Sequence, residues 1–540
     1  GGDKVREIIH AKVSAKELQD YVNLGDTPIV FKGGAERAIV TEIEITNPAG
    51  DNFSKLDLKN VTIQIQVPVS IDASAANFTI IASKAAITRT GTAQLALKNG
   101  IKFLTGSRVD TDAVNENGAT VPEVVTSVDE ITDKIAQGDD VTFDGTLTAA
   151  QLAGLSGSGT LYVTGAVKLE NSNTIPAAAK VAVAGELVVT GTVNLGGNTG
   201  LDLSAATLTT GSATTSVTLP ASASLNAINA SGDLTLAGSG SVTVTGAATF
   251  GGETTISTAV TFKGETTFND ETDFNANVTF EKTAVINDTA SVEASSTLAI
   301  AATGSISVAG ELTAAASSVV NVAAGGKIEV AGTFTIASGA SGDLNGTISI
   351  KSGGTSYDLK ASGGSLWGGG DSDGKYVFEP GAKAYVGGDD DDDDLVIGGS
   401  GDTTARLQLT SGTFSNNASG YVLDGNATIN KTFFLTGGTP CTIKAGRTLT
   451  IGANRNSPQV VLGLVVDTGK PGLLGENNAT IVVNSWIDIW ATDMTCPTDI
   501  SNQPHNFYSA SSTKEAVNSL GGIYKWDATL GSSAGGWKAQ

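Results

Sequence analysis

A six-residue repeat in the middle of the chain constrains the fold more than any other feature. From Phe250 to Leu298, a large apolar residue recurs at every sixth position, and the residue two places before it is small or β-branched. Strand alternation turns both side chains toward the same side, so the residue between them faces outward. That residue is mostly threonine, which suits a solvated strand. The large positions are Phe250, Ile256, Phe262, Phe268, Phe274, Phe280, Ile286, Val292 and Leu298.

Strands this short do not pair as a meander of hairpins, but they stack well when the chain winds in coils. Parallel pairing with the coils above and below then satisfies the backbone. If three repeats form one coil, successive coils rise by about 4.8 Å and equivalent residues form ladders. The positions predicted to be buried are Phe262, Phe268, Phe274 and Phe280, and those predicted to face outward are Thr255, Thr261 and Thr267.

The same period returns on both sides of this window, for example at Val181, Leu187 and Val193. The spacing slips between blocks, so we expect coils of varying length with insertions at the corners. Glycines between strands, such as Gly185 and Gly332, favour tight corners because glycine adopts dihedral angles that other residues avoid. The sequence therefore predicts a central β-solenoid over residues 138–360.

The N-terminal part, residues 1–137, follows other patterns. From Lys4 to Asn23, apolar residues lie on one helical face, and Ser14 precedes Glu17 as in a capping box. This predicts a short helix that caps the first coil. Segments with the two-residue alternation of strands follow it, and the pattern at 128–135 indicates a second start of winding.

The C-terminal part, residues 361–540, changes again. It holds all five tryptophans and an unbroken acidic run, with strand-like segments between longer loops. We expect a distinct β-rich region there. The whole chain is thus predicted to be all-β, with an N-terminal cap helix and β unit, a parallel β-solenoid and a β-rich C-terminal region.

The repeats resemble known families. The window from Phe250 to Leu298 resembles hexapeptide-type β-helices, and the coils at 185–195 and 325–336 are similar to those of pectin-lyase-like bacterial surface proteins and adhesins. Segments 521–526 and 536–540 are similar to the tails of Gly/Thr-rich surface proteins of spirochaete-like bacteria. These resemblances imply a parallel solenoid at a bacterial cell surface. Because phenylalanine replaces the usual aliphatic residue and the coils vary in length, we favour a right-handed winding.

The charge of the chain excludes one class of partner. Lysine and arginine number 32 against 55 aspartates and glutamates, giving a net charge of -23. An acidic surface repels phosphates, so we expect no nucleic-acid partner, whereas divalent cations suit it. No stretch approaches the roughly 20 apolar residues of a membrane span, so no transmembrane segment is expected. Few charges and many small polar residues are typical of secreted proteins, which predicts an extracellular or cell-surface location.

One acidic run is a candidate cation site. Six consecutive aspartates repel one another unless cations neutralise them, and calcium prefers carboxylate oxygens. The alternative is a solvated loop without an ion. A second open choice concerns Cys441 and Cys496, which either form one disulfide or stay free thiols. The candidate calcium ligands are Asp389, Asp390, Asp391, Asp392, Asp393 and Asp394.

The residues that enzymes use on such folds are missing from the repeats. Hexapeptide acyltransferases need a histidine between coils, but His10 and His505 both lie outside the repeats. The segment Trp486–Trp490 is similar to the "W-I-D-H" pattern of pectin-lyase-like enzymes, except that Ile489 takes the place of its histidine. We therefore predict no enzymatic activity and no cofactor other than calcium.

These features favour a structural protein that polymerises with itself into a surface layer, sheath or filament. Its last strand, at Ile523–Trp526, has no helix after it, so we expect that end to offer a free edge for assembly. The alternative is an adhesin or carbohydrate-binding protein, in which Trp367, Trp526 or Trp537 stack on the sugar rings of surface glycans. A polysaccharide lyase or hydrolase ranks third.

Overall fold

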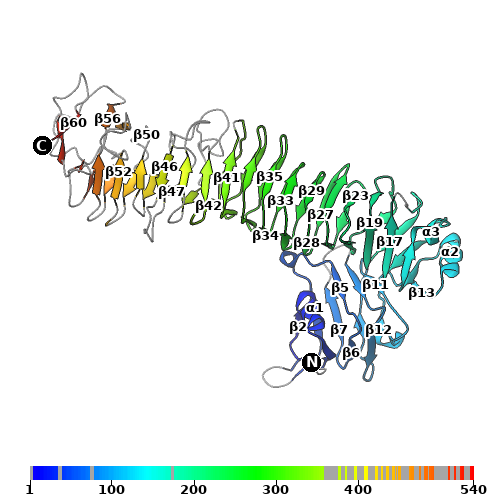
Figure 1. Cartoon of the computed structure of the whole chain (residues 1–540). Coiled ribbons are helices and arrows are strands. Elements are labelled where there is room, and N and C mark those ends of the chain that lie inside the picture. Colours follow the sequence, from blue (N-terminus) through cyan, green and yellow to red (C-terminus); the bar gives the residue numbers. More distant parts are fainter. Residues whose placement is uncertain are drawn as a thin grey trace. The chain divides into compact units, whose positions relative to one another are not determined.

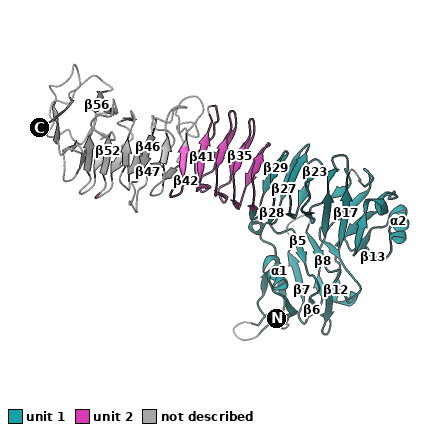
Figure 2. Cartoon of the chain, in the orientation of Figure 1, with its two compact units in different colours: residues 1–266 teal, residues 267–540 magenta. Residues whose placement is uncertain are grey.

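The computed structural model describes residues 4–34, 39–72, 78–171, 175–337 and 339–356 in full, and the backbone of individual strands farther along. The chain divides into two compact units, residues 1–266 and 267–540 (Figure 2). The boundaries predicted at 137 and 360 concern other divisions and stay predictions. Figure 1 shows that strands dominate both units and that the described helices lie in the first.

Unit 1 begins with a short solenoid of its own, drawn in blue in Figure 1. Its strands form three parallel sheets, in the orders β1-β3-β6-β9, β2-β4-β7-β10-β12 and β5-β8-β11. Alternate side chains point into a shared apolar core. The strands are β1 (Lys4–Ile8), β2 (Lys12–Ser14), β3 (Asp26–Phe31), β4 (Ile43–Thr46), β5 (Lys55–Asp57), β6 (Thr62–Ile65), β7 (Val69–Asp72), β8 (Thr79–Ile81), β9 (Ala86–Arg89), β10 (Leu95–Ala96), β11 (Lys102–Leu104) and β12 (Val114–Asn115).

A helix closes the first coil of this solenoid, as predicted. It is α1 (Ala15–Asn23), and the Ser14 hydroxyl accepts a hydrogen bond from the backbone N–H of Glu17 at 3.0 Å. Its apolar face is buried in the core. The predicted start at Lys4 is wrong, because the first residues form β1 and pair with β3. A five-residue segment fits a helical face or a strand equally well, and here pairing with β3 decides.

A second helix begins the second solenoid, which confirms the second start of winding. It is α2 (Val128–Gln137), and it opens with a capping box between Ser127 and Glu130. It ends at Gly138, whose φ of 90° needs glycine. Its own residues Ile131 and Ile135 are buried. Around it lie β13 (Glu123–Val125), β14 (Val141–Phe143), β15 (Thr146–Thr148) and a short helix, α3 (Ala149–Leu152).

In unit 1 the second solenoid also has parallel sheets, in the orders β13-β14-β16-β18-β21, β15-β17-β19-β22-β25-β28, β20-β23-β26-β29 and β24-β27-β30. Its further strands are β16 (Thr160–Val163), β17 (Ala166–Glu170), β18 (Lys180–Val183), β19 (Glu186–Thr190), β20 (Thr192–Asn194), β21 (Leu201–Asp202), β22 (Thr207–Thr210), β23 (Thr215–Leu219), β24 (Ser224–Leu225), β25 (Ala227–Ala230), β26 (Leu234–Gly238), β27 (Ser241–Val244), β28 (Ala248–Phe250), β29 (Thr254–Ile256) and β30 (Ala259–Phe262).

Unit 2 contains parallel solenoid coils of the same kind. Its described strands are β31 (Thr266–Phe268, which starts at the unit boundary), β32 (Thr272–Phe274), β33 (Val278–Phe280), β34 (Thr283–Ile286), β35 (Ala290–Val292), β36 (Thr297–Ile300), β37 (Ser305–Val308), β38 (Leu312–Ala314), β39 (Val319–Val322), β40 (Lys327–Val330), β41 (Thr333–Ile336), β42 (Thr347–Ile350) and β43 (Thr355–Tyr357). Farther along, the backbone forms strands from β44 (Lys375–Phe378) to β60 (Gly536–Ala539). The fold is thus mostly a parallel β-solenoid, as predicted, with antiparallel pairs among the strands beyond β43. Its hand stays a prediction.

The register confirms that three repeats form one coil. Val242 in β27 lies beside Val260 in β30, eighteen residues later, and Thr272 in β32 lies beside Ala290 in β35 at the same interval. Other coils are longer, as the slipping spacing predicted; Ala284 lies beside Ile306, twenty-two residues on. The phenylalanines predicted to be buried are at most 1% exposed, namely Phe262, Phe268, Phe274 and Phe280.

The threonines between the buried positions face outward, as predicted. Thr255 in β29 stands beside Thr235 in β26, and Thr261 in β30 stands beside Thr243 in β27. Each is half-buried, because its neighbours in the ladder cover part of its side chain. On these strands the outer face therefore carries rows of small polar side chains one strand spacing apart, about 4.8 Å.

One corner of the coils in unit 2 holds non-glycine residues in the left-handed region. Ser295, Ser317 and Gly339 occupy equivalent places in successive coils, with φ of 64°, 65° and 89°. The N–H of Ser295 donates to the carbonyl of Ser317 at 3.2 Å, and the N–H of Ser317 donates to that of Gly339 at 3.2 Å. Of these three positions, only the third has glycine, the residue type that this left-handed backbone favours.

We expect Ser317→Gly to stabilise the coils by about 0.5 kcal/mol, because relief of left-handed strain outweighs the extra entropy of glycine in the unfolded chain. The urea midpoint of unfolding measures the effect. The matched control is Ser307→Gly, which removes a serine from the outer face of β37 and should destabilise. A loss of stability for Ser317→Gly as large as that of the control would contradict the strain argument.

Candidate functional site: the contact between the two solenoids

Within unit 1, the outer face of sheet β5-β8-β11 packs on the outer face of sheet β13-β14-β16-β18-β21 (Figure 1). Ile81 and Leu104 are neighbours on the outer face of the first solenoid, and both are at most 5% exposed. They contact small and aromatic residues of the second solenoid. We call this buried group the docking cluster; it consists of Ile81, Leu104, Tyr162, Ala182, Ala184 and Ala205.

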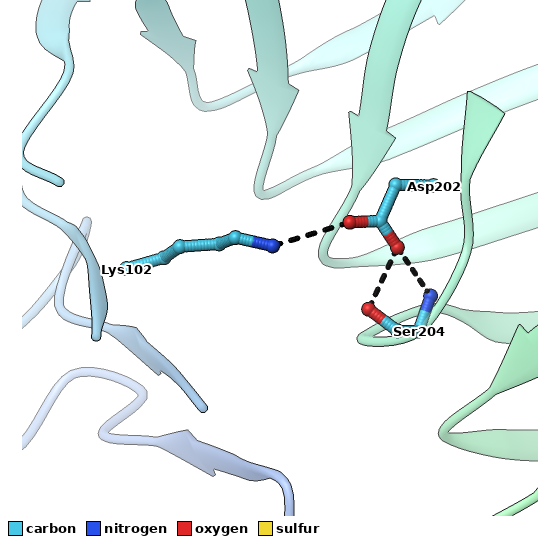
Figure 3. A network of polar contacts seen from close by, with 3 residues as sticks. All are labelled: Lys102, Asp202 and Ser204. Atoms are coloured by element: carbon cyan, nitrogen blue, oxygen red, sulfur yellow. Dashed lines mark hydrogen bonds and ion pairs between the residues drawn. The ribbon is translucent and has the colours of Figure 1, made fainter. Parts of the chain in front are cut away.

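An ion pair borders the docking cluster. The Lys102 ammonium donates to a carboxylate oxygen of Asp202 at 3.2 Å, and the other oxygen accepts from the Ser204 hydroxyl at 2.7 Å and its backbone N–H at 2.9 Å (Figure 3). Burial raises the pKa of Asp202, but the hydrogen bonds from Ser204 and the charge of Lys102 outweigh burial and hold that pKa below its usual range. Asp202 is therefore a fixed anion that positions the lysine of the facing sheet.

A second lysine reaches across the contact. The Lys55 ammonium donates to the backbone carbonyls of Ala184 and Ala205 at 2.7 and 2.8 Å, and so joins the first solenoid to a corner of the second. Burial lowers the pKa of Lys55, although the carboxylates of Asp57 and Glu186 oppose that shift. The contact thus combines apolar burial with two cross-solenoid lysines, which fixes one docked arrangement within unit 1.

Two hollows of unit 1 are lined by described residues. A cavity of about 10 Å³ lies between Lys102, Asp202 and Tyr162, which is the size of a single water molecule. A larger, open depression of about 480 Å³ has no titratable residue in its lining. That lining consists of Ala153, Ile175, Pro176, Ala177, Asn194, Gly197 and Asn198.

The residues singled out in the sequence fall mostly outside the described residues. The carboxylates of the acidic run from Asp389 to Asp394 lie there, and only the backbone of Asp394 is seen, at the start of β46 (Asp394–Ile397). The five tryptophan side chains, both cysteine side chains and His505 also lie outside, whereas His10 is exposed between β1 and β2. In the described ranges, no three histidine, cysteine or acidic side chains gather as metal ligands would.

The docking cluster was missed by the sequence analysis, although a signal existed. Exposed strands alternate apolar and polar residues, but β8 reads Thr-Ile-Ile and β11 reads Lys-Phe-Leu. Ile80 and Phe103 face the core, so Ile81 and Leu104 place apolar side chains on the opposite face. Two adjacent strands that are apolar on both faces indicate a second packing partner.

The fold and the docked contact define the class of this chain as a parallel β-solenoid protein with two solenoids in tandem. No protein-family model matches the chain, and neither the curated proteins nor the solved structures contain a significant match. Among the described helices, none has the length and apolar character to cross a membrane.

Proposed function

We propose that this chain is an extracellular structural protein that assembles with itself into a surface layer, sheath or filament and catalyses no reaction. The observation that carries the proposal is the outer surface of the solenoid, where rows of threonine and serine repeat at the spacing of the strands over a filled core. Such regularly spaced rows of small polar side chains suit lateral packing of identical molecules. A filled interior offers no room for a substrate.

The contact between the solenoids supports the same proposal. A subunit in a polymer must present its surfaces in one fixed arrangement, because small changes in angle accumulate along the assembly. In unit 1, the docking cluster together with Lys55 and Lys102 supplies that rigidity. A location at the cell surface, and calcium binding by Asp389 to Asp394, belong to this proposal.

Sedimentation velocity of the full chain, over a wide range of concentrations and with or without calcium, tests the proposal. We expect species much larger than the monomer, with a threshold concentration for assembly. A chain that stays monomeric at high concentration under both conditions would refute self-assembly. If that monomer bound an array of glycans, the adhesin function would replace this one.

The ion pair of the contact gives a testable pH dependence. The pKa of Asp202 is lowered in the folded protein, so this carboxylate adds stability at pH values above its ordinary pKa of 3.8. The contribution disappears as the pH falls through the lower folded-state pKa. We expect wild type to be more stable than Asp202→Asn at neutral pH, by at most about 1 kcal/mol because the pair is partly exposed. The two should converge in acid, and a pH-independent difference in urea unfolding would contradict this.

A further inference from the structure

A single residue joins the two solenoids of unit 1. Val121 packs against the core of the first solenoid, whereas Glu123 in β13 pairs with Val141 in β14 of the second. Only Pro122 lies between them. The ring of proline fixes its φ and keeps the residue before it extended, so few torsions at this connection are free to change. Short connections of this kind favour exchange of a domain between copies, because they leave few ways for the two halves to close on each other.

The contact between the solenoids is separate from the fold of either one. The buried core of the first solenoid consists of residues between 8 and 113. Among the described strands, none pairs with a strand of the other solenoid. The hydrogen bonds that cross the contact come from side chains, chiefly those of Lys55 and Lys102. The contact can therefore open by rotation at Pro122 while both solenoids keep their sheets.

Opening leaves two complementary faces without a partner. One face carries Ile81 and Leu104 with the two lysines. The other carries Tyr162, the Asp202 carboxylate and the carbonyls that receive Lys55. Ile81, Leu104 and Tyr162 are each at most 8% exposed in the closed contact, so opening costs free energy until these side chains are covered again. A second copy of this chain carries both faces with every one of these groups in place.

We propose that in the assembled state the first solenoid of one copy docks on the second solenoid of a neighbouring copy, through the same docking cluster and the same two lysines. The closed and exchanged forms then share every contact and differ only at Pro122 and in the entropy of association, so a rise in concentration favours exchange. When each copy docks on the next one, the contact is heterologous and continues into a polymer. The inference rests on the proposed self-assembly and identifies a surface that links the copies.

Cross-linking of an equimolar mixture of unlabelled and heavy-isotope-labelled full chain tests the exchange. The two are mixed below the threshold concentration for assembly and then concentrated. A carbodiimide joins Lys102 directly to Asp202, whose charged groups lie 3.2 Å apart and whose side chains are 20% and 41% exposed. We expect about half of these links in the polymer to join a labelled to an unlabelled peptide, because neighbours are drawn at random. In the monomer each link should be uniformly labelled or uniformly unlabelled.

The control for this experiment is the ion pair between Lys134 and Glu123. Its charged groups lie 2.9 Å apart within the second solenoid, and both side chains are accessible to the reagent. Links between these two residues should be uniform in monomer and polymer alike.

A pair of charge-reversal variants tests the exchange without cross-linking. Lys102→Asp and Asp202→Lys each place like charges across the contact of a single copy, so each variant alone should raise the threshold concentration for assembly about tenfold. Their equimolar mixture restores opposite charges only when the solenoids are exchanged between the two variants, and it should assemble close to the wild-type threshold. Uniform links in assembled wild type overturn the exchange alone, and so does a mixture that gains nothing over either variant. A wild type that stays monomeric overturns the proposed function together with it.

Discussion

Phe268→Ala is expected to lower the free energy of unfolding of the central coils by about 3 to 5 kcal/mol. Phe268 is fully buried, and its ring packs edge-on against Phe274 and Phe280, with centroids 5.9 and 6.3 Å apart. Truncation therefore removes both the burial of the ring and two aromatic contacts, and it leaves a cavity. Urea unfolding, or hydrogen exchange of β31, β32 and β33, measures the loss.

The control for this change is Thr267→Ser, at the outward-facing position just before Phe268. It lies in the same strand but on the outer face, so it should alter stability by no more than about 0.5 kcal/mol. A difference between the two variants below about 1 kcal/mol would mean that the phenylalanine ladder does not support the coil.

Leu104→Asp should release the first solenoid from the second while each keeps its own fold. Leu104 is fully buried in the docking cluster, so the change places an unpaired carboxylate in an apolar contact at a cost of about 3 to 5 kcal/mol. Hydroxyl-radical footprinting reports release directly, because Tyr162 is only 8% exposed when docked.

The control is Lys98→Asp, on the exposed surface of the first solenoid. It should leave Tyr162 protected from radical attack. Equal protection of Tyr162 in wild type and Leu104→Asp would show that the docking cluster does not hold the two solenoids together.

The sequence predicted the central coils well because their period encodes which side chains face the core. Residues six apart must repeat their environment when three repeats make a coil, so the burial of Phe262 and Phe280 followed directly. The cap of α1 followed from Ser14 and Glu17 alone, since side-chain capping is local. Local patterns of this kind need no knowledge of the remaining chain.

The first solenoid was harder to recognise, because long corners interrupt its coils. The connection between β3 and β4 spans residues 32–42, so equivalent residues of successive coils are far apart and irregularly spaced. Lys4–Ile8 was assigned to a helix for a related reason: its pairing with β3 is not visible in its own five residues. The docking cluster depends on two surfaces that meet only after both solenoids fold.

The central claim is that this solenoid is a subunit of an ordered polymer, and electron microscopy of the purified full chain tests it most directly. The account predicts filaments or sheets with a regular repeat. Isolated particles at every concentration, with and without calcium, would contradict it.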